Sequence, residues 1–427
     1  MFSKLLFKIG QNLRNPSLQN LYFFLKEAEK WKLEQLVSYQ EKKLFELVNI
    51  AYEYSSYYKN SFDLLGLKPS DIKSIEDLKK LPIISKKELL LYNSEIHTTN
   101  SFKKLFEANT SGTSGESLKF KRDEHADSFN RASIFRGYSW YTIKPWDRNG
   151  YFWGFDFSKS EEKKVKVTDW LQNRFRIFSY NRKDVAIFIR KLRKATYLHG
   201  YSSMVYEMAK LINSQNFKKP LKLKMVKGTS EKIVEAYQEE IKKAFGIKMI
   251  SEYGAAETGI IAFECRNGNM HINMEGVIVE EVDNEIIVTN LQMKSFPIIR
   301  YRLGDYIKLA VKDKRCSCGM HHPILEEVTG RIGKLVYGKN NTYPSLYFYY
   351  IFKNLAQHKG LELMYQVQQN KKGELLFLIE GNLTKKELNL VQQEIETYFK
   401  KDMNYTIEVS KKLVSKNTKL KSFISTI

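Results

Sequence analysis

Apolar residues recur at helical spacing in the first part of the chain. Between Lys32 and Tyr58 they lie three or four positions apart and form one stripe, which predicts an amphipathic helix. Another helix is expected directly after the sequence Leu81-Pro82-Ile83-Ile84-Ser85, because the proline ends one element and Ser85 is a suitable cap for the next. This part of the chain is therefore expected to be mainly helical.

Short apolar runs alternate with helical patterns in the middle of the chain. The runs predict strands at 151–155, 197–201, 223–226 and 248–251. The helical patterns cover 184–194, 203–212 and 231–245. Thr229-Ser230 and Gly246 are expected to cap the last of these helices. This alternation is typical of an α/β domain with a largely parallel sheet.

After Gly254 the pattern changes to short strands separated by tight turns. They are expected at 276–282, 285–290, 298–301 and 306–311, and they predict a β-rich subdomain at about 255–330. A smaller α+β pattern follows, in which Thr384 and Glu387 form a capping box for a helix over 385–400. We therefore predict an α/β protein with a large N-terminal domain of mostly parallel sheets, residues 1–330, and a small mobile α+β domain, residues 331–427.

Length and charge narrow the classes of function. A chain of 427 residues is long enough for two domains, and no stretch approaches the roughly 20 apolar residues of a membrane span. The first ten residues lack the features of a signal peptide, so a cytoplasmic protein is expected. The net charge of +22 comes from lysines spread along the chain, without a nucleic-acid recognition motif. It predicts a lysine-rich solvated surface, with peripheral attraction to an anionic membrane as the alternative.

The segment Asn109-Thr110-Ser111-Gly112-Thr113-Ser114-Gly115-Glu116-Ser117 has the composition of a phosphate-binding loop. Its glycines let the backbone approach a ligand closely, and its hydroxyl groups donate to phosphate oxygens. The spacing is not that of a Walker loop, because no Gly-Lys-Ser/Thr sequence follows. A Ser/Thr/Gly segment on its own is more often an ordinary turn, so the assignment depends on what accompanies it.

Three further segments follow in the order in which one large family carries them. They are Glu252-Tyr253-Gly254-Ala255-Ala256-Glu257, Tyr301-Arg302-Leu303-Gly304-Asp305 and Gly330-Arg331. Together with residues 110–115 they resemble the motifs of the adenylate-forming (acyl-CoA synthetase-like) superfamily, over nearly the whole chain. The segments 81–86 and 198–203 look most like its phenylacetate–CoA ligase-like branch, and within that branch like the capsule and surface-polysaccharide biosynthesis subgroup.

The resemblance implies a role for each matched residue. Glu257 would hold Mg²⁺, a cation that prefers carboxylate and phosphate oxygens, Tyr253 would stack on adenine, and Asp305 would accept hydrogen bonds from the ribose. Without the motif order, Glu257 would be a helix-start carboxylate and Asp305 a turn residue. The ATP-binding set implied by the resemblance is Thr110, Ser111, Gly112, Thr113, Ser114, Gly115, Gly228, Thr229, Ser230, Glu252, Tyr253, Gly254, Asp305 and Arg331.

Some positions depart from the family pattern. Ala256 stands where the family has Thr or Ser, which removes one hydroxyl contact to the α-phosphate, and Gly333-Lys334 stands where the hinge is commonly acidic. The catalytic lysine of the family lies in the C-terminal domain. Lys419 aligns best with it, and Lys416 and Lys421 are the competitors.

All three cysteines fall in one region of the chain. Cys265 and His271 flank a hairpin-like turn, and Cys316-Ser317-Cys318-Gly319 forms a second tight turn. Two turns that each supply two ligands are typical of structural zinc sites of the Cys₃His type, and some members of the branch carry the same arrangement. His321 or His322 is an alternative fourth ligand, and buried free cysteines are the alternative without a metal.

The resemblance implies a two-step reaction. A carboxylic acid is adenylated by Mg-ATP with release of pyrophosphate, and an acceptor then takes the acyl group after the C-terminal domain swings. The expected acceptor is CoA, and the alternative is an amine or hydroxyl on a sugar, glycan precursor or carrier protein. A second alternative is an inactive scaffold at a membrane surface, which the basic, apolar residues 2–14 would suit. Retention of Glu257, Asp305 and Lys419 argues against that loss of activity.

Overall fold

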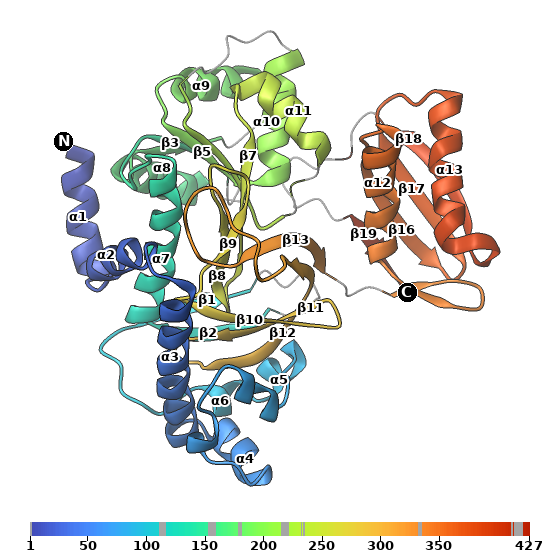
Figure 1. The fold of residues 1–427 in the computed structure, drawn as a ribbon. Helices are drawn as coiled ribbons and strands as arrows, with labels where there is room; N and C mark the ends of the chain where they lie inside the picture. The colour runs from blue at the N-terminus through green and yellow to red at the C-terminus, as the bar shows by residue number, and fades with distance from the viewer. Residues whose placement is uncertain are drawn as a thin grey trace. The chain divides into compact units, whose positions relative to one another are not determined.

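The computed structural model describes residues 2–110, 117–152, 159–177, 182–214, 222–231, 233, 235–331, 335–410, 413 and 422–427. The chain divides into two compact units. The first unit comprises Met1–Asp147, Leu171–Asn173 and Ile250–Val328, and the second comprises Arg148–Trp170, Arg174–Met249 and Thr329–Ile427. Figure 1 follows both along the chain from blue to red.

The helices of the first unit precede its main sheet in the chain. They are α1 (Phe2–Arg14), α2 (Leu18–Ala28), α3 (Leu33–Tyr54), α4 (Ser56–Leu64), α5 (Lys86–Leu91), α6 (Asn93–Ile96) and α7 (Glu124–Trp140), with 3₁₀ turns at Pro69–Asp71 and Glu76–Lys80. The predicted helix over 32–58 is confirmed as α3, but Ser55 is extended and caps a second helix, α4. Ser85 caps α5 as predicted, in a capping box with Glu88. None of the described helices combines the length and apolar character needed to cross a bilayer.

The first unit also holds the β-rich part of the chain. Its strands are β1 (Leu105–Asn109), β2 (Lys119–Asp123), β7 (Met249–Ala255), β8 (Gly259–Glu264), β9 (Met270–Ile272), β10 (Val277–Val282), β11 (Glu285–Asn290), β12 (Ile298–Leu309) and β13 (Ile324–Arg331). β1 and β2 form an antiparallel hairpin. The others are neighbours in the order β10-β11-β12-β13-β9-β8-β7. Leu44 of α3 and Phe62 of α4 pack in one core with Val288 and Ile299 of this sheet.

The second unit contains the parallel sheet that the strand–helix alternation predicted. Its strands β3 (Asn149–Phe152), β4 (Arg174–Arg176), β5 (Tyr197–Tyr201) and β6 (Met225–Thr229) pair in parallel in the order β4-β3-β5-β6. The helices between and after them are α8 (Lys159–Leu171), α9 (Arg182–Leu192), α10 (Ser202–Ser214) and α11 (Glu235–Phe245). Phe152, Leu198 and Val226 of the sheet share a core with Phe188 of α9 and Ile241 of α11.

One predicted boundary in this unit is wrong. α11 was expected to start at Glu231 after a Thr229-Ser230 cap, but it starts at Glu235. Ser230 has φ of +62°, a left-handed conformation that does not lead into a helix. The Glu231 carboxylate instead accepts the Ser203 N–H at 2.8 Å, at the start of α10.

The C-terminal part of the second unit is a small α+β structure. Its elements are β14 (Leu335–Tyr337), β15 (Thr342–Pro344), α12 (Leu346–Lys359), β16 (Met364–Lys371), β17 (Glu374–Glu380), α13 (Lys385–Phe399), a 3₁₀ turn (Lys400–Asp402), β18 (Asn404–Ser410) and β19 (Phe423–Ser425). The main sheet has the order β18-β17-β16-β19, and Figure 1 shows α12 and α13 beside it. Phe377 and Ile379 of β17 share a core with residues of both helices. The Thr384–Glu387 capping box is confirmed. The α/β class with a small C-terminal α+β part is thus as predicted, and the boundary at 330/331 stays a prediction.

Candidate functional site

The turn between β7 and β8 carries Glu257 in a buried position. The residue is 2% exposed, and its Oε1 accepts the Tyr301 hydroxyl at 3.1 Å. Tyr301 is itself 1% exposed and lies in β12. Glu257 is therefore not the helix-start carboxylate of the alternative interpretation. It is a buried carboxylate in a turn between two strands, positioned by a neutral donor.

A second tyrosine–carboxylate bond lies between the same two parts of the chain. Tyr253 of β7 donates its hydroxyl to Asp305 Oδ2 of β12 at 2.7 Å. Each bond thus joins one residue of the 252–257 motif to one residue of the 301–305 motif, and the donor and acceptor roles are exchanged between the two. The structure brings together two motifs that the sequence separates by more than forty residues.

Asp305 lies in a bulge of β12. The sequence predicted two strands there, 298–301 and 306–311, but β12 is continuous from Ile298 to Leu309. Glu285 of β11 pairs with Tyr306 while Ile287 pairs with Arg302, so β12 carries two extra residues. Gly304, with φ of +82°, supplies the left-handed conformation that the bulge requires. The glycine of the motif therefore serves to aim Asp305 toward Tyr253.

Gly254, the glycine of the 252–257 motif, is required for a different reason. A Cβ at Gly254 would lie 2.3 Å from the Gly259 carbonyl oxygen, so the close approach of β7 and β8 excludes any side chain. Immediately after it, the Ala255 N–H donates to Thr258 Oγ1 at 3.2 Å, and Arg122 Nη2 donates to the Ala256 carbonyl. The backbone on both sides of Glu257 is therefore fixed by side chains.

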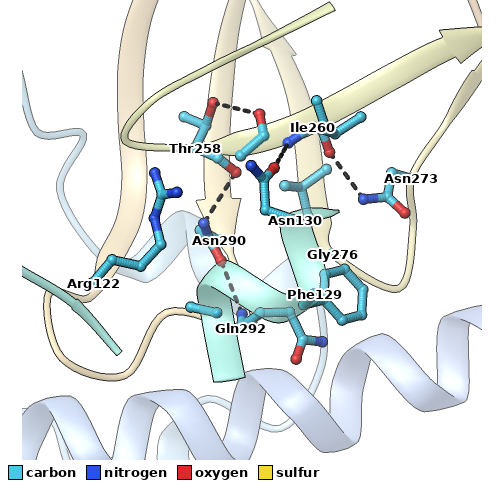
Figure 2. Close-up of a pocket in the computed structure, with 12 residues that line it drawn as sticks. Arg122, Phe129, Asn130, Thr258, Ile260, Asn273, Gly276, Asn290 and Gln292 are labelled. Carbon is cyan, nitrogen blue, oxygen red and sulfur yellow. Dashed lines mark hydrogen bonds between the residues drawn. The ribbon is translucent and has the colours of Figure 1, made fainter. Parts of the chain in front are cut away.

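Three asparagines hold the far end of this turn, as Figure 2 shows. Asn130 of α7 accepts the Ile260 N–H at 2.9 Å, and Asn273 donates to the Ile260 carbonyl at 2.9 Å. Asn290 of β11 donates to the Thr258 carbonyl at 3.0 Å. These asparagines line a pocket of about 20 Å³ beside the turn, which has room for about one water molecule. The asparagines and Arg122 are residues that the sequence analysis did not identify.

The remaining nucleotide-binding candidates are only partly described. Thr110 contacts the residues just after the predicted phosphate loop, since its Oγ1 accepts the Leu118 N–H at 3.0 Å and its carbonyl accepts the Ser117 hydroxyl at 2.6 Å. The candidates that lie outside the described residues are Ser111, Gly112, Thr113, Ser114, Gly115, Lys419, its competitors Lys416 and Lys421, and the hinge pair Gly333-Lys334. Arg331 ends β13, and its side chain is not described. Glu252 is a half-buried residue of β7.

Gly228, Thr229 and Ser230 lie in the second unit, at the end of β6. A Cβ at Gly228 would lie 2.4 Å from Ser202 Oγ, so this glycine allows close contact with the start of α10. The Ser202 hydroxyl in turn donates to the Glu231 carbonyl at 3.1 Å. The segment is therefore a fixed loop at the end of a parallel strand, which is where open α/β sheets bind ligands.

The structure also gathers the four predicted zinc ligands. The ligand atoms of Cys265, His271, Cys316 and Cys318 all lie within 4.8 Å of one another. The Sγ atoms of Cys265 and Cys316 are 3.7 Å apart, and Cys318 Sγ is 3.2 Å from His271 Nε2. A tetrahedral zinc ion places two sulfurs about 3.8 Å apart and a sulfur and a nitrogen about 3.6 Å apart. The donor set and its spacing therefore fit zinc.

The surroundings of the cluster orient its ligands. His271 Nδ1 lies 3.1 Å from the His322 carbonyl, which leaves Nε2 toward the sulfurs. Burial lowers the pKa of His271 to about 4, so the ring is neutral at pH 7, as a metal ligand must be. Asn269 Nδ2 donates to Cys316 Sγ at 3.2 Å. His322, an alternative ligand in the sequence analysis, is occupied elsewhere, because its Nε2 lies 3.0 Å from Glu275 Oε1.

A buried polar network lies between the cluster and the Glu257 turn. Arg136 donates to Glu275 Oε1 and to Asn273 Oδ1, both at 2.7 Å, and His322 shares the Glu275 oxygen. Burial raises the pKa of Glu275, but Arg136 and His322 outweigh it and bring the pKa down to about 2. The carboxylate is therefore charged at neutral pH. Through Asn273 and His322, the network touches both the turn and the cluster.

Comparison with curated proteins gives two matches. No protein-family model matches the chain. Protein CapK of Staphylococcus aureus is 23% identical over 328 residues, which are 70% of this chain and 71% of that protein. Indoleacetate–lysine synthetase of Pseudomonas savastanoi is 32% identical over 91 residues, which are 20% of this chain and 22% of that protein.

Solved structures match over nearly the whole chain. 2-Hydroxyisobutyryl-CoA ligase in its postadenylation state, in complex with 2-HIB-AMP, has a TM-score of 0.71 at 15% identity and covers 94% of this chain and 91% of its own. The same ligase with 2-HIB-AMP and CoA in the thioesterification state has a TM-score of 0.60 at 17% identity, over 94% and 91% of the two chains. The chain therefore has the fold of the adenylate-forming ligases, the superfamily that its motifs resemble.

Proposed function

We propose that this chain is an AMP-forming acid ligase, which adenylates a carboxylic acid with Mg-ATP and releases pyrophosphate. The observation that carries the proposal is the pair of reciprocal bonds, Tyr253 to Asp305 and Tyr301 to Glu257. They fix two carboxylates, one in the β7–β8 turn and one in β12, each by a neutral hydroxyl donor. A nucleotide with its magnesium ion needs both of these acceptors.

In this proposal the two carboxylates have separate tasks. Glu257 would hold Mg²⁺, since a carboxylate that is 2% exposed and contacted by a tyrosine hydroxyl suits a hard cation. Asp305 would accept the ribose hydroxyls, and Tyr253 would both stack on adenine and hold Asp305. The Mg²⁺ ion would supply charge neutralisation on the phosphates. Ala256 offers no hydroxyl, so the α-phosphate would depend on backbone N–H groups of the turn.

Other residues complete the proposed nucleotide site. Residues 110–115 would cradle the β- and γ-phosphates, Gly228, Thr229 and Ser230 would line the adenine pocket, and Arg331 would contact the ribose. Lys419 would neutralise the charge that develops when the acid attacks the α-phosphorus. The C-terminal domain, proposed to begin at residue 331, would bring this lysine to the site.

CoA is the proposed acceptor of the acyl group. The solved ligase with the same fold binds an acyl-AMP and CoA, and the phenylacetate–CoA ligase-like branch is the proposed placement of this chain. CapK and the motif resemblance favour a task in surface-polysaccharide biosynthesis. A second candidate, acyl transfer to an amine without CoA, is favoured by the segment that is 32% identical to an acid–lysine synthetase.

The Cys265–His271–Cys316–Cys318 cluster is proposed to bind a structural zinc ion. All four positions of a tetrahedral ion would be filled by the protein, which leaves no open position for a substrate. The zinc would therefore tie the β8–β9 turn to the 316–319 turn and take no part in the chemistry.

A product analysis tests the proposal. The protein is incubated with Mg-ATP, a panel of carboxylic acids, and either CoA or an amine such as lysine, and the products are identified by mass spectrometry. AMP together with one acyl-CoA supports the ligase, and an acyl amide supports the second candidate. If no acid yields AMP and ATP does not raise the melting temperature, the proposal is wrong and the inactive scaffold takes its place.

A further inference from the structure

α1 presents an apolar face that the rest of the first unit leaves uncovered. Leu5, Ile9 and Leu13 recur every four residues and so lie along one side of the helix. Their exposed fractions are 58%, 49% and 73%, and that of Phe2 is 60%. Large apolar side chains gathered on one exposed face are typical of an interaction surface.

The other side of α1 is fixed against α7. The rings of Phe7 and Phe135 lie 5.7 Å apart, and directly after the helix Asn15 donates to Asp127 Oδ2 at 2.9 Å. The earlier residue, Phe7, contacts the end of α7, and the later residue, Asn15, contacts its beginning. The two helices are therefore antiparallel. Figure 1 shows α1 at the left edge of the view. The protein therefore uses one side of the helix for packing and displays the opposite side.

The charges of α1 select the kind of partner. The helix contains Lys4, Lys8 and Arg14 and no acidic residue, and Lys104 reaches its last turn, with Nζ 2.7 Å from the Leu13 carbonyl. The whole chain carries a net charge of +22. A second copy of this chain would bring the same positive charge against α1 and be repelled. The partner must therefore be apolar and negatively charged.

We infer that α1 is an interfacial helix that docks the protein on an anionic lipid bilayer. A helix of 13 residues is about 20 Å long and is too short to span a bilayer. It can lie in the interface, with Phe2, Leu5, Ile9 and Leu13 at the acyl-chain boundary and Lys4 and Lys8 among the headgroups. None of these residues belongs to the proposed nucleotide or zinc sites, so the inference does not depend on the proposed function.

Vesicle flotation of the full chain tests the inference. The probes are phosphatidylcholine vesicles with and without about 30% phosphatidylglycerol. We expect binding only to the anionic vesicles, and weaker binding as salt is raised. The triple variant Leu5→Ala/Ile9→Ala/Leu13→Ala keeps every charge and should bind at least about tenfold more weakly. Lys8→Gln should weaken binding about fivefold at low salt.

A matched control separates the helix from overall charge. Leu64 and Val311 are 88% and 77% exposed in the same unit, and Leu64→Ala/Val311→Ala should bind vesicles like the unaltered protein. Equal binding by the triple variant and this control would overturn the inference, because charge alone would then account for binding. Absence of vesicle binding, or self-association that the triple variant abolishes, would overturn it as well. Unchanged AMP formation by the triple variant shows that the site is intact, and a protein that forms no AMP still gives a clear flotation result.

Discussion

The motif pair and the cysteine–histidine cluster lie in the same unit but are held in different ways. Glu257 and Asp305 are positioned by tyrosines of β12 and β7 respectively, and the turn around Glu257 is fixed by side chains from α7 and β11. The cluster instead consists of four ligand atoms within 4.8 Å of one another on two tight turns. Thiolates at such distances repel one another unless a cation lies between them. The first site is thus organised by hydrogen bonds within the protein, whereas the second is the one that we propose to depend on a zinc ion.

The comparison predicts that the stability of the protein and its activity depend on different residues of this unit. Loss of the metal should destabilise the sheet without removing a group that contacts substrate. Loss of a motif carboxylate should remove activity without unfolding the protein. The network of Arg136, Glu275 and His322 joins the two regions. Substitutions in this network therefore test whether stability and activity are independent of each other.

Removing zinc should have the largest effect on stability. Structural zinc contributes on the order of 10 kcal/mol in small peptides, and we expect chelation to lower the free energy of unfolding here by several kcal/mol. The measurement is thermal unfolding with and without a strong chelator, alongside the zinc content of the purified protein. Cys265→Ser is the control, since chelation should not destabilise it further. A purified protein without zinc, whose melting temperature a chelator leaves unchanged, would contradict this prediction.

The substitution Glu275→Gln should cause the second largest loss of stability. It leaves Arg136 and the buried His322 without their charged partner, which costs about 3–5 kcal/mol. Glu374→Gln is the matched control, because Glu374 pairs with Lys371 on the surface and should lose less than about 1 kcal/mol. Chemical denaturation at pH 7 measures both.

The effect of Glu275 should also depend on pH. The pKa of Glu275 is about 2 in the folded protein and about 4.3 in an unfolded chain. Its stabilising contribution is therefore fully present above about pH 4.3 and is lost as the pH falls toward 2. The difference in stability between Glu275→Gln and the unaltered protein should shrink over that range. A constant difference would show that the carboxylate charge is not what stabilises the network.

Glu257→Gln should abolish most activity with little change in stability. Removing a group that stabilises charge in the transition state typically lowers kcat by about 10²–10³-fold, and Gln retains the size and can still accept from Tyr301. The measurement is steady-state pyrophosphate release, with thermal unfolding as a check of folding. Glu34→Gln, on the exposed side of α3, should behave like the unaltered protein. Equal activity of Glu257→Gln would remove this residue from the proposed site.

The two tyrosine hydroxyls should give the smallest effects. Each donates one hydrogen bond to a carboxylate, worth about 1.5–3 kcal/mol, so Tyr253→Phe and Tyr301→Phe should each lower the activity by about 10- to 150-fold. Tyr253→Phe should raise the KM for ATP, and Tyr301→Phe should raise the Mg²⁺ concentration needed for half-maximal activity. If both variants shift the same parameter, the separate tasks of Asp305 and Glu257 are wrong.

The sequence predicted the residues that carry a local pattern. The helix cap at Ser85, the capping box at Thr384, the strand–helix alternation and the grouping of the cysteines all depend on short spacings, and the structure agrees with them. The continuity of β12 was missed, because Gly304 and Asp305 are typical of a turn and only pairing with β11 makes them a bulge.

The residues that hold the Glu257 turn were missed for a related reason. Asn130, Asn273 and Asn290 are isolated polar residues, and their partners are backbone groups far along the chain. One signal was present in the sequence of α7, where polar residues such as Asp127 and Arg136 occupy positions that are buried. A helix that is polar on its buried face indicates a polar network, although its partners cannot be read from the helix alone.

The central claim is that the reciprocal tyrosine–carboxylate bonds organise an adenylation site. Isotope exchange between labelled pyrophosphate and ATP tests it most directly, because exchange reports acyl-adenylate formation whatever the later acceptor is. The zinc-loaded protein should catalyse exchange that requires one class of carboxylic acid, and Glu257→Gln should reduce it about 10²-fold or more. Exchange that needs no acid, or a folded protein that gives no exchange with any acid of a broad panel, would contradict the account.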